Sequence, residues 1–133
     1  MPPRQRPASV NTITVRDEKP SDEVFLYELY ASTRQDELDA AGWLPEMRGG
    51  FLTLQFRARQ QGYHTTFAGA EFQIIMVDGV NAGEIIIHRT REELRVVDIA
   101  LVPRFRNVGV GTSLLKRLLG ESAATRKPVK ARS

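Results

Sequence analysis

The sequence predicts an α/β protein with a mixed sheet, in which an antiparallel meander is followed by a parallel β-α-β step and helices flank the sheet. Two observations carry this prediction. Residues 72–102 contain three apolar stretches separated by short turns, which is typical of strands joined as hairpins. The third stretch leads through a glycine-containing loop into an amphipathic helix and then a further short apolar stretch. A right-handed crossover would lay this last strand parallel to the third one.

The N-terminal part predicts an arm, a strand and two helices. Residues 1–10 hold three prolines and two arginines without any periodic pattern, so we expect a flexible arm, followed by one domain over residues 11–133. Residues 11–16 alternate apolar and polar side chains, as a short strand does. We expect a helix capped by Ser21 that runs to about residue 34, and a second helix over residues 45–63 that begins at Pro45.

The remaining elements follow from turn and helix signals. Strands are expected at residues 72–77, 82–89 and 94–102, with Asp78-Gly79 and Arg91-Glu92 as the two turns. Pro103 ends the third strand, and residues 110–119 have apolar side chains at helical spacing. Residues 128–132 begin the last strand.

Composition excludes several classes of protein. The chain of 133 residues contains no cysteine, which excludes disulfides, thiolate metal sites and cysteine nucleophiles. Its apolar runs are too short for a membrane span, and its N-terminus has no apolar signal core. We therefore expect a soluble, cytoplasmic protein with no membrane partner and no metal.

The net charge of +3 is unevenly distributed. From residue 104 onward there are eight basic residues and one acid, a net charge of +7, whereas the first 103 residues hold 11 basic and 15 acidic residues, a net charge of −4. Such an asymmetry favours an anionic ligand at the C-terminal end. A solvated basic tail and a nucleic-acid surface are the alternatives that charge alone leaves open.

The loop before the third helix carries the most informative motif. Arg106, Gly109 and Gly111 form R-x-x-G-x-G between a strand and a helix. Glycines allow close approach of the backbone to a ligand, and the free amides at a helix N-terminus attract anions such as a pyrophosphate. A glycine-rich turn before an ordinary core helix could have the same sequence. The loop therefore indicates an anion site only together with the strand and the helix that flank it.

With the preceding Ile99-Ala100-Leu101-Val102-Pro103, this loop resembles the pyrophosphate loop of the GNAT N-acetyltransferases. The resemblance extends over about residues 11–132, because the two N-terminal helices and the meander come in the same order as in that family. A Rossmann unit would instead place G-x-G-x-x-G after the first strand of an alternating pattern. The resemblance implies acetyl-CoA as co-substrate, held by residues Leu101, Val102, Arg106, Asn107, Val108, Gly109, Val110, Gly111 and Thr112.

The resemblance also implies the reaction. An amine of a small molecule or peptide would attack the thioester directly in a ternary complex, with a strand amide near Leu101 polarising the carbonyl. Asp98 is the only acid on the strand before the loop and hence the candidate general base, with a structural hydrogen-bond acceptor as the equal alternative. Glu84 and His88 are weaker candidates, expected by strict alternation on the face opposite to Asp98.

Other candidates for the acceptor site are aromatic. Trp43, Tyr27 and Tyr30 are expected either to line an acceptor site between the first two helices or to serve in the core. His64, expected in a loop, has no partner that suggests a role.

Two further functions remain open. The resemblance implies a further helix and a closing hairpin after the last strand, with an asparagine and a thiolate-protonating tyrosine, so we expect the domain to be incomplete here. An inactive CoA-binding module is therefore one alternative, and a homodimer through the exposed sheet edge is a possible assembly. A basic nucleic-acid-binding protein is the other, disfavoured because the basic end contains only Phe105 as an aromatic residue.

Overall fold

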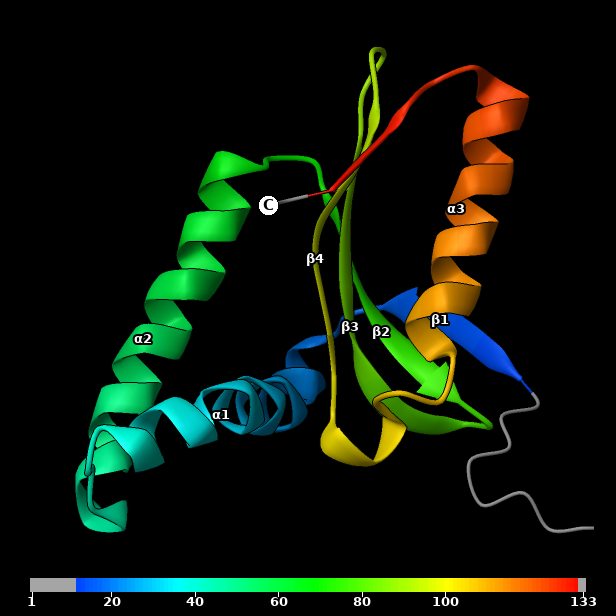
Figure 1. Cartoon of the computed structure of the whole chain (residues 1–133). Helices are drawn as coiled ribbons and strands as arrows, with labels where there is room; N and C mark the ends of the chain where they lie inside the picture. Colours follow the sequence, from blue (N-terminus) through cyan, green and yellow to red (C-terminus); the bar gives the residue numbers. More distant parts are fainter. Residues whose placement is uncertain (1–11, 132–133) are drawn as a thin grey trace, which may run out of the picture.

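A computed structural model describes residues 12–131 of the chain, and it has a single mixed sheet with helices on both faces (Figure 1). The five strands lie in the order β1-β2-β3-β4-β5. Helices α1 and α2 lie on one face and α3 on the other. The elements are β1 (Ile13–Asp17), η1 (Pro20–Asp22), α1 (Glu23–Ala40), α2 (Pro45–Thr66), β2 (Glu71–Val77), β3 (Val80–Arg89), β4 (Leu94–Leu101), η2 (Pro103–Phe105), α3 (Val110–Thr125) and β5 (Val129–Ala131).

The sheet confirms the predicted fold class. β1 to β4 pair antiparallel with their sequence neighbours, and β5 returns through α3 to pair parallel with β4. The apolar core is divided by the sheet: one cluster packs under α3, while a smaller one lies between α1, α2 and the opposite face. The arm predicted at residues 1–10 and the last residue of the strand predicted at 128–132 lie outside the described residues.

Three details of the N-terminal half differ from the prediction. Helix α1 continues to Ala40, beyond residue 34, because Leu38 is buried and extends the apolar face by two turns. Ser21 is not the cap, since it lies in η1, and Asp22 occupies the N-cap position of α1. His64 is not in a loop: it lies in the last turn of α2 and stacks on the Phe72 ring at 3.8 Å between ring centroids.

A one-residue irregularity in β4 sets the geometry of the site. Ile87 pairs with Val96, but Ile86 pairs with Asp98, so Val97 is an extra residue in β4 and forms a β-bulge. Val97 is completely buried. Because a one-residue shift moves every later side chain to the other face, the bulge decides which side chains of β4 share a face with those of β3.

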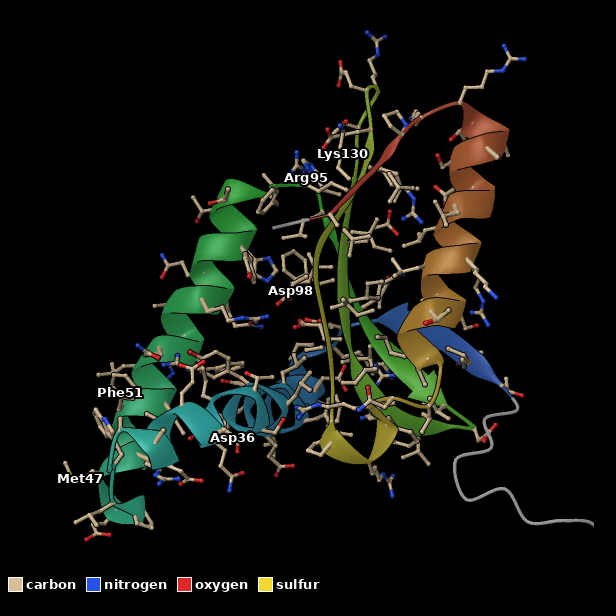
Figure 2. All side chains as sticks on the ribbon, viewed as in Figure 1. Asp36, Met47, Phe51, Arg95, Asp98 and Lys130 are labelled. Carbon is tan, nitrogen blue, oxygen red and sulfur yellow. The ribbon has the colours of Figure 1, made fainter. Side chains whose placement is uncertain are left out.

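Within residues 12–131, no helix is long and apolar enough to cross a bilayer. The long helix α2 carries two glycines in its first two turns, and polar residues occur at both of its ends. Its far end and that of α1 form a hairpin that extends beyond the sheet, where Figure 2 shows Met47 and Phe51.

Candidate functional site

The loop before α3 is shaped by a positive backbone dihedral at its last residue. Gly109, at the N-cap of α3, has φ +88°, a left-handed conformation that glycine adopts without the cost other residues incur. The first-turn amides of α3 have no intrahelical acceptor. No side chain caps them in this helix. The loop therefore presents a row of free N–H donors at the positive end of a helix dipole.

A groove of about 560 Å³ opens directly in front of these amides. It runs from the α3 N-terminus along the end of β4 to Thr33 on α1. Seven of the nine donor-site residues predicted from the sequence line this groove: Leu101, Arg106, Asn107, Gly109, Val110, Gly111 and Thr112. The other two do not line it. Val108 packs against the core under α3, and the amide of Val102 donates to the Ala82 carbonyl.

The end of β4 offers one free amide to the groove. Val102 binds β3 through its amide, and neighbouring residues of an antiparallel strand point their hydrogen-bonding groups to opposite edges. The amide of Leu101 therefore points away from β3, into the groove that it lines. Its carbonyl accepts a bond of 2.8 Å from Arg106 Nε, and Arg106 Nη2 also reaches Ser32 Oγ on α1 at 3.3 Å. Arg106 thus fixes the groove wall.

Gly111 has no internal reason to be glycine. Its φ lies outside the left-handed region, and a Cβ built on it would meet no atom within 4 Å. A glycine in the first turn of a helix lowers helix stability relative to alanine. Gly111 lines the groove, so the absence of a side chain leaves its backbone open to the groove.

A second, smaller cavity adjoins the groove on the face covered by α1 and α2. It has a volume of about 180 Å³, the space of about six water molecules in the liquid. Thr33, Ile99 and Ala100 line both the cavity and the groove, so the two spaces share a wall at the end of β4. The cavity also contains three charged side chains, from Arg59, Glu84 and Asp98.

Both carboxylate oxygens of Asp98 are engaged. Oδ1 accepts the backbone amide of Ile99 at 2.9 Å, and Oδ2 accepts Nη2 of Arg59. Figure 2 shows Asp98 on the side of β4 that faces α2. These bonds match the structural alternative that the sequence left open, because they hold the strand after the bulge and anchor α2 to the sheet.

Arg59 is the one cation that the cavity walls contribute. Its Nη1 lies 3.7 Å from Glu84 Oε1, and its guanidinium carbon lies 4.8 Å from the Tyr63 ring centroid and 5.7 Å from that of Tyr30. Such cation–π contacts hold a guanidinium in place. Arg59 is therefore a fixed counter-ion between Asp98 and Glu84, which sequence periodicity on α2 could not reveal.

The expected placement of Glu84 and His88 was wrong. A two-residue turn with a regular ladder would pair Asp98 with Ile85 and put Glu84 on the other face. The bulge at Val97 shifts the pairing by one residue, so Asp98 pairs with Ile86 and Glu84 pairs with Ala100. Glu84 and Asp98 consequently lie on the same face, where Arg59 contacts both. His88 follows the same alternation along β3 but packs against Phe67, with 5.8 Å between ring centroids, at the other end of the strand.

Glu18, just after β1, was missed by the sequence analysis. Burial, together with the hydrogen bond to Glu84 and its charge, raises the pKa of Glu18 to about 9. Glu84 is only 3% exposed. The Oε2 atoms of both residues are buried, and within the described chain no other group donates to either. The raised pKa favours the neutral form of Glu18, which can donate a hydrogen bond to the Glu84 carboxylate. In the sequence Glu18 stands in the charged stretch Arg16-Asp17-Glu18-Lys19 after a predicted strand, and nothing in that stretch indicates burial.

The aromatic candidates lie at different distances from this cavity. Tyr30 lines it, in agreement with the first alternative for that residue. Tyr27 packs edge-on against Phe56, with ring centroids 5.7 Å apart, and lines a separate pocket. Trp43 stacks on Phe51 at 4.5 Å near the tip of the helical hairpin, so it does not reach the cavity.

Comparison with known proteins defines the class to which this fold belongs. No protein-family model and no curated protein sequence matches the chain. Solved structures of acetyltransferases do match. The paia N-acetyltransferase from Thermoplasma acidophilum, in complex with coenzyme A, is 14% identical with a TM-score of 0.57, over 86% of this chain and 74% of that one.

Two further structures agree. A GNAT family acetyltransferase from Staphylococcus aureus is 18% identical with a TM-score of 0.54, over 92% of this chain and 87% of that one. A putative acetyltransferase of the GNAT family from Desulfovibrio desulfuricans is 19% identical with a TM-score of 0.52, over 87% of this chain and 69% of that one. The chain thus has the fold of the GNAT N-acetyltransferases, and the resemblance noted in the sequence is confirmed at the level of the fold.

Proposed function

We propose that this protein is an N-acetyltransferase that moves an acetyl group from acetyl-CoA to a primary amine. The observation that carries the proposal is the junction of two spaces at the end of β4: a groove in front of the α3 N-terminus and a charged cavity, which share Thr33, Ile99 and Ala100 as walls. A donor in the groove and an acceptor in the cavity would meet at this wall. The fold shared with the acetyltransferases supports the same assignment.

The donor site is proposed along the loop. The amides of residues 108–112 would bind the pyrophosphate of acetyl-CoA, because a helix N-terminus with free N–H groups favours an anion. Arg106, which lines the groove, adds a positive charge there. The free amide of Leu101 would pair with the pantetheine arm or polarise the thioester carbonyl. Coenzyme A bound in the Thermoplasma acidophilum structure is consistent with this ligand class.

The proposed reaction is direct transfer in a ternary complex. The amine nitrogen attacks the carbonyl carbon, the oxyanion is stabilised by a backbone amide, and the carbon–sulfur bond breaks to release coenzyme A. No enzyme-bound acyl intermediate is required, in keeping with a sequence that contains no cysteine.

The test is transfer of a radiolabelled acetyl group from acetyl-CoA to a panel of polyamines, amino acids and peptide N-termini. We expect label in at least one amine, and loss of transfer when Gly109 is replaced by valine. Arg106→Ala should reduce transfer less, since Arg106 supports the groove wall rather than supplying the amides. Tight binding of acetyl-CoA without transfer to any amine would favour the CoA-binding module instead. Failure to bind acetyl-CoA more tightly than adenosine would refute the donor site.

A further inference from the structure

The carboxyl pair formed by the half-buried Glu18 and the buried Glu84 has no structural explanation in the fold. Glu84 lies on β3, the central strand, between Ile74 on β2 and Ala100 on β4. An isolated carboxylate at such a position is costly, and an apolar residue would fill it at no such cost. A second carboxyl from Glu18 adds to the cost. A carboxylate kept on the central strand, with a second carboxyl beside it, calls for a use of its charge.

We propose that Glu84 accepts the proton that the acceptor's ammonium group must lose before it attacks the thioester, and that Glu18 is a positioning residue that holds Glu84 through a shared proton. This inference rests on the function proposed above and names the base for it. The evidence is geometric: Glu84 lines the cavity, its Oε2 receives no bond from other described groups, and it sits directly across the ladder from Ala100, which lines both cavity and groove.

The neighbouring acids are less suited to this role. Asp98 has both oxygens engaged, by the Ile99 amide and by Arg59. Asp22 is held by two bonds of 2.8 Å from Arg16 and one from the Lys19 amide, and these lower its pKa to about 2. A carboxylate with so low a pKa is a poor proton acceptor. Beside the Glu18 carboxyl, Glu84 has only a long ion pair of 3.7 Å to Arg59, so a lone pair of its carboxylate stays available.

The surroundings of the pair set its charge. The raised pKa of Glu18 favours its neutral form, and the cavity walls carry two acidic side chains, Glu84 and Asp98, and one basic side chain, Arg59. Their sum favours a cationic ammonium group over a carboxylate as ligand. No group of three metal-ligating side chains occurs in residues 12–131. The titratable and charged groups around the pair are Arg16 on β1, Asp22 in η1, Tyr30 on α1, Arg59 and Tyr63 on α2, and Asp98 on β4.

The proton balance is simple. The ammonium group gives one proton to Glu84, which becomes a neutral acid, and the free amine forms the new carbon–nitrogen bond as the carbon–sulfur bond breaks. After the attack the same nitrogen loses a second proton, and the departing thiolate of coenzyme A takes up one proton. Glu84 returns its proton to solvent before the next turnover.

The decisive comparison uses amide substitutions. We expect Glu84→Gln to lower kcat for a small primary amine by about 100-fold or more, the usual contribution of a general base, while its Kd for acetyl-CoA, measured by calorimetry, stays within about two-fold of that of the wild type. Asp98→Asn should lower kcat much less. Glu121→Gln is the matched control: it makes the same chemical change on α3, on the opposite face, where Glu121 binds Arg89, and its kcat should be that of the wild type.

Glu18 is tested by the pH profile. Glu18→Gln keeps a neutral donor to Glu84, so its kcat at pH 7.5 should stay near that of the wild type, whereas Glu18→Leu should lose activity. Above pH about 9, where Glu18 ionises, kcat of the wild type should fall below that of Glu18→Gln. If Glu18 had only a structural role, the pH profiles of kcat for the wild type and Glu18→Gln would change in the same way with pH. Identical profiles for wild type and Glu18→Gln would overturn the role of the pair.

The titration of Glu18 can also be measured in the ligand-free protein, without any turnover. The ¹³C carboxyl resonances of glutamate should show one group that titrates near pH 9 and disappears in Glu18→Gln. Titration of every glutamate near its ordinary pKa would overturn the shared proton. Full acetyl transfer by Glu84→Gln would overturn this inference alone, whereas absence of transfer by the wild type would overturn the proposed function together with it.

Discussion

Replacing Gly111 by alanine should have two opposite effects: it should stabilise α3 and weaken the binding of acetyl-CoA. A Cβ at Gly111 meets no atom within 4 Å and its φ is not in the left-handed region, so the folded protein accommodates the change without strain. Alanine favours the helix over glycine by up to about 1 kcal/mol. In the first turn of α3 we expect about 0.5 kcal/mol of added stability.

The same methyl group should weaken binding. It occupies the groove in front of the α3 amides, where a phosphate must come within hydrogen-bonding distance of the backbone. Loss of one charge-assisted hydrogen bond costs about 2 kcal/mol, which corresponds to a Kd for acetyl-CoA about 30-fold higher.

The assays are urea unfolding for stability and calorimetry for acetyl-CoA binding. Gly120→Ala is the matched control, because Gly120 also lies in α3, with no atom near its Cβ and no positive φ, but away from the groove. We expect both variants to be more stable than the wild type and only Gly111→Ala to bind acetyl-CoA less well. Equal binding by the two variants would refute the argument that acetyl-CoA binds close to the backbone of Gly111.

Three other perturbations test the fold and its charges. Gly83→Ala should lower the free energy of unfolding by about 2 kcal/mol, because its Cβ would lie 2.1 Å from the Ala100 carbonyl oxygen across the β3–β4 ladder; urea unfolding measures this, and an unchanged midpoint would contradict the register. Arg16 lowers the pKa of Asp22 to about 2, so the stability from this pair is present above pH 4 and lost as the pH falls towards 2; thermal unfolding of Asp22→Asn should lack that part of the acid sensitivity. Since the pKa of Glu18 is raised to about 9, its contribution to stability is full below pH 4.5 and is lost as the pH rises towards 9. Glu18→Gln should therefore gain Tm over the wild type across that interval, and a constant difference in Tm would count against the raised pKa.

The donor loop could be predicted because its signals are local. The strand end at Pro103, the glycines at 109 and 111 and the apolar helix stripe lie within some twenty residues, and each acts through its own backbone. Val102 and Val108 were included in the donor set by their position in the motif alone. The structure places them off the groove because alternation turns Val102 towards β3 and packing turns Val108 towards the core.

The charged cavity could not be predicted in the same way. Glu18, Arg59 and Glu84 come from a loop, a helix and a strand separated by tens of residues, and only the folded sheet brings them together. Their faces also depend on the bulge at Val97, which no turn or periodicity marks. Strict alternation without the bulge therefore predicted the wrong face for Glu84, and Asp98 was the candidate base.

The central claim is that acetyl-CoA binds in the groove at the N-terminus of α3, and amide chemical shifts of the ¹⁵N-labelled protein test it most directly. On addition of acetyl-CoA, we expect the largest shifts at residues 108–112 and at Leu101, with smaller ones at Ala100 and Thr33 across the shared wall. Adenosine at the same concentration should leave residues 108–112 unmoved, because it lacks the pyrophosphate. Shifts confined to the basic residues after 125, or the same shifts with adenosine, would contradict the account.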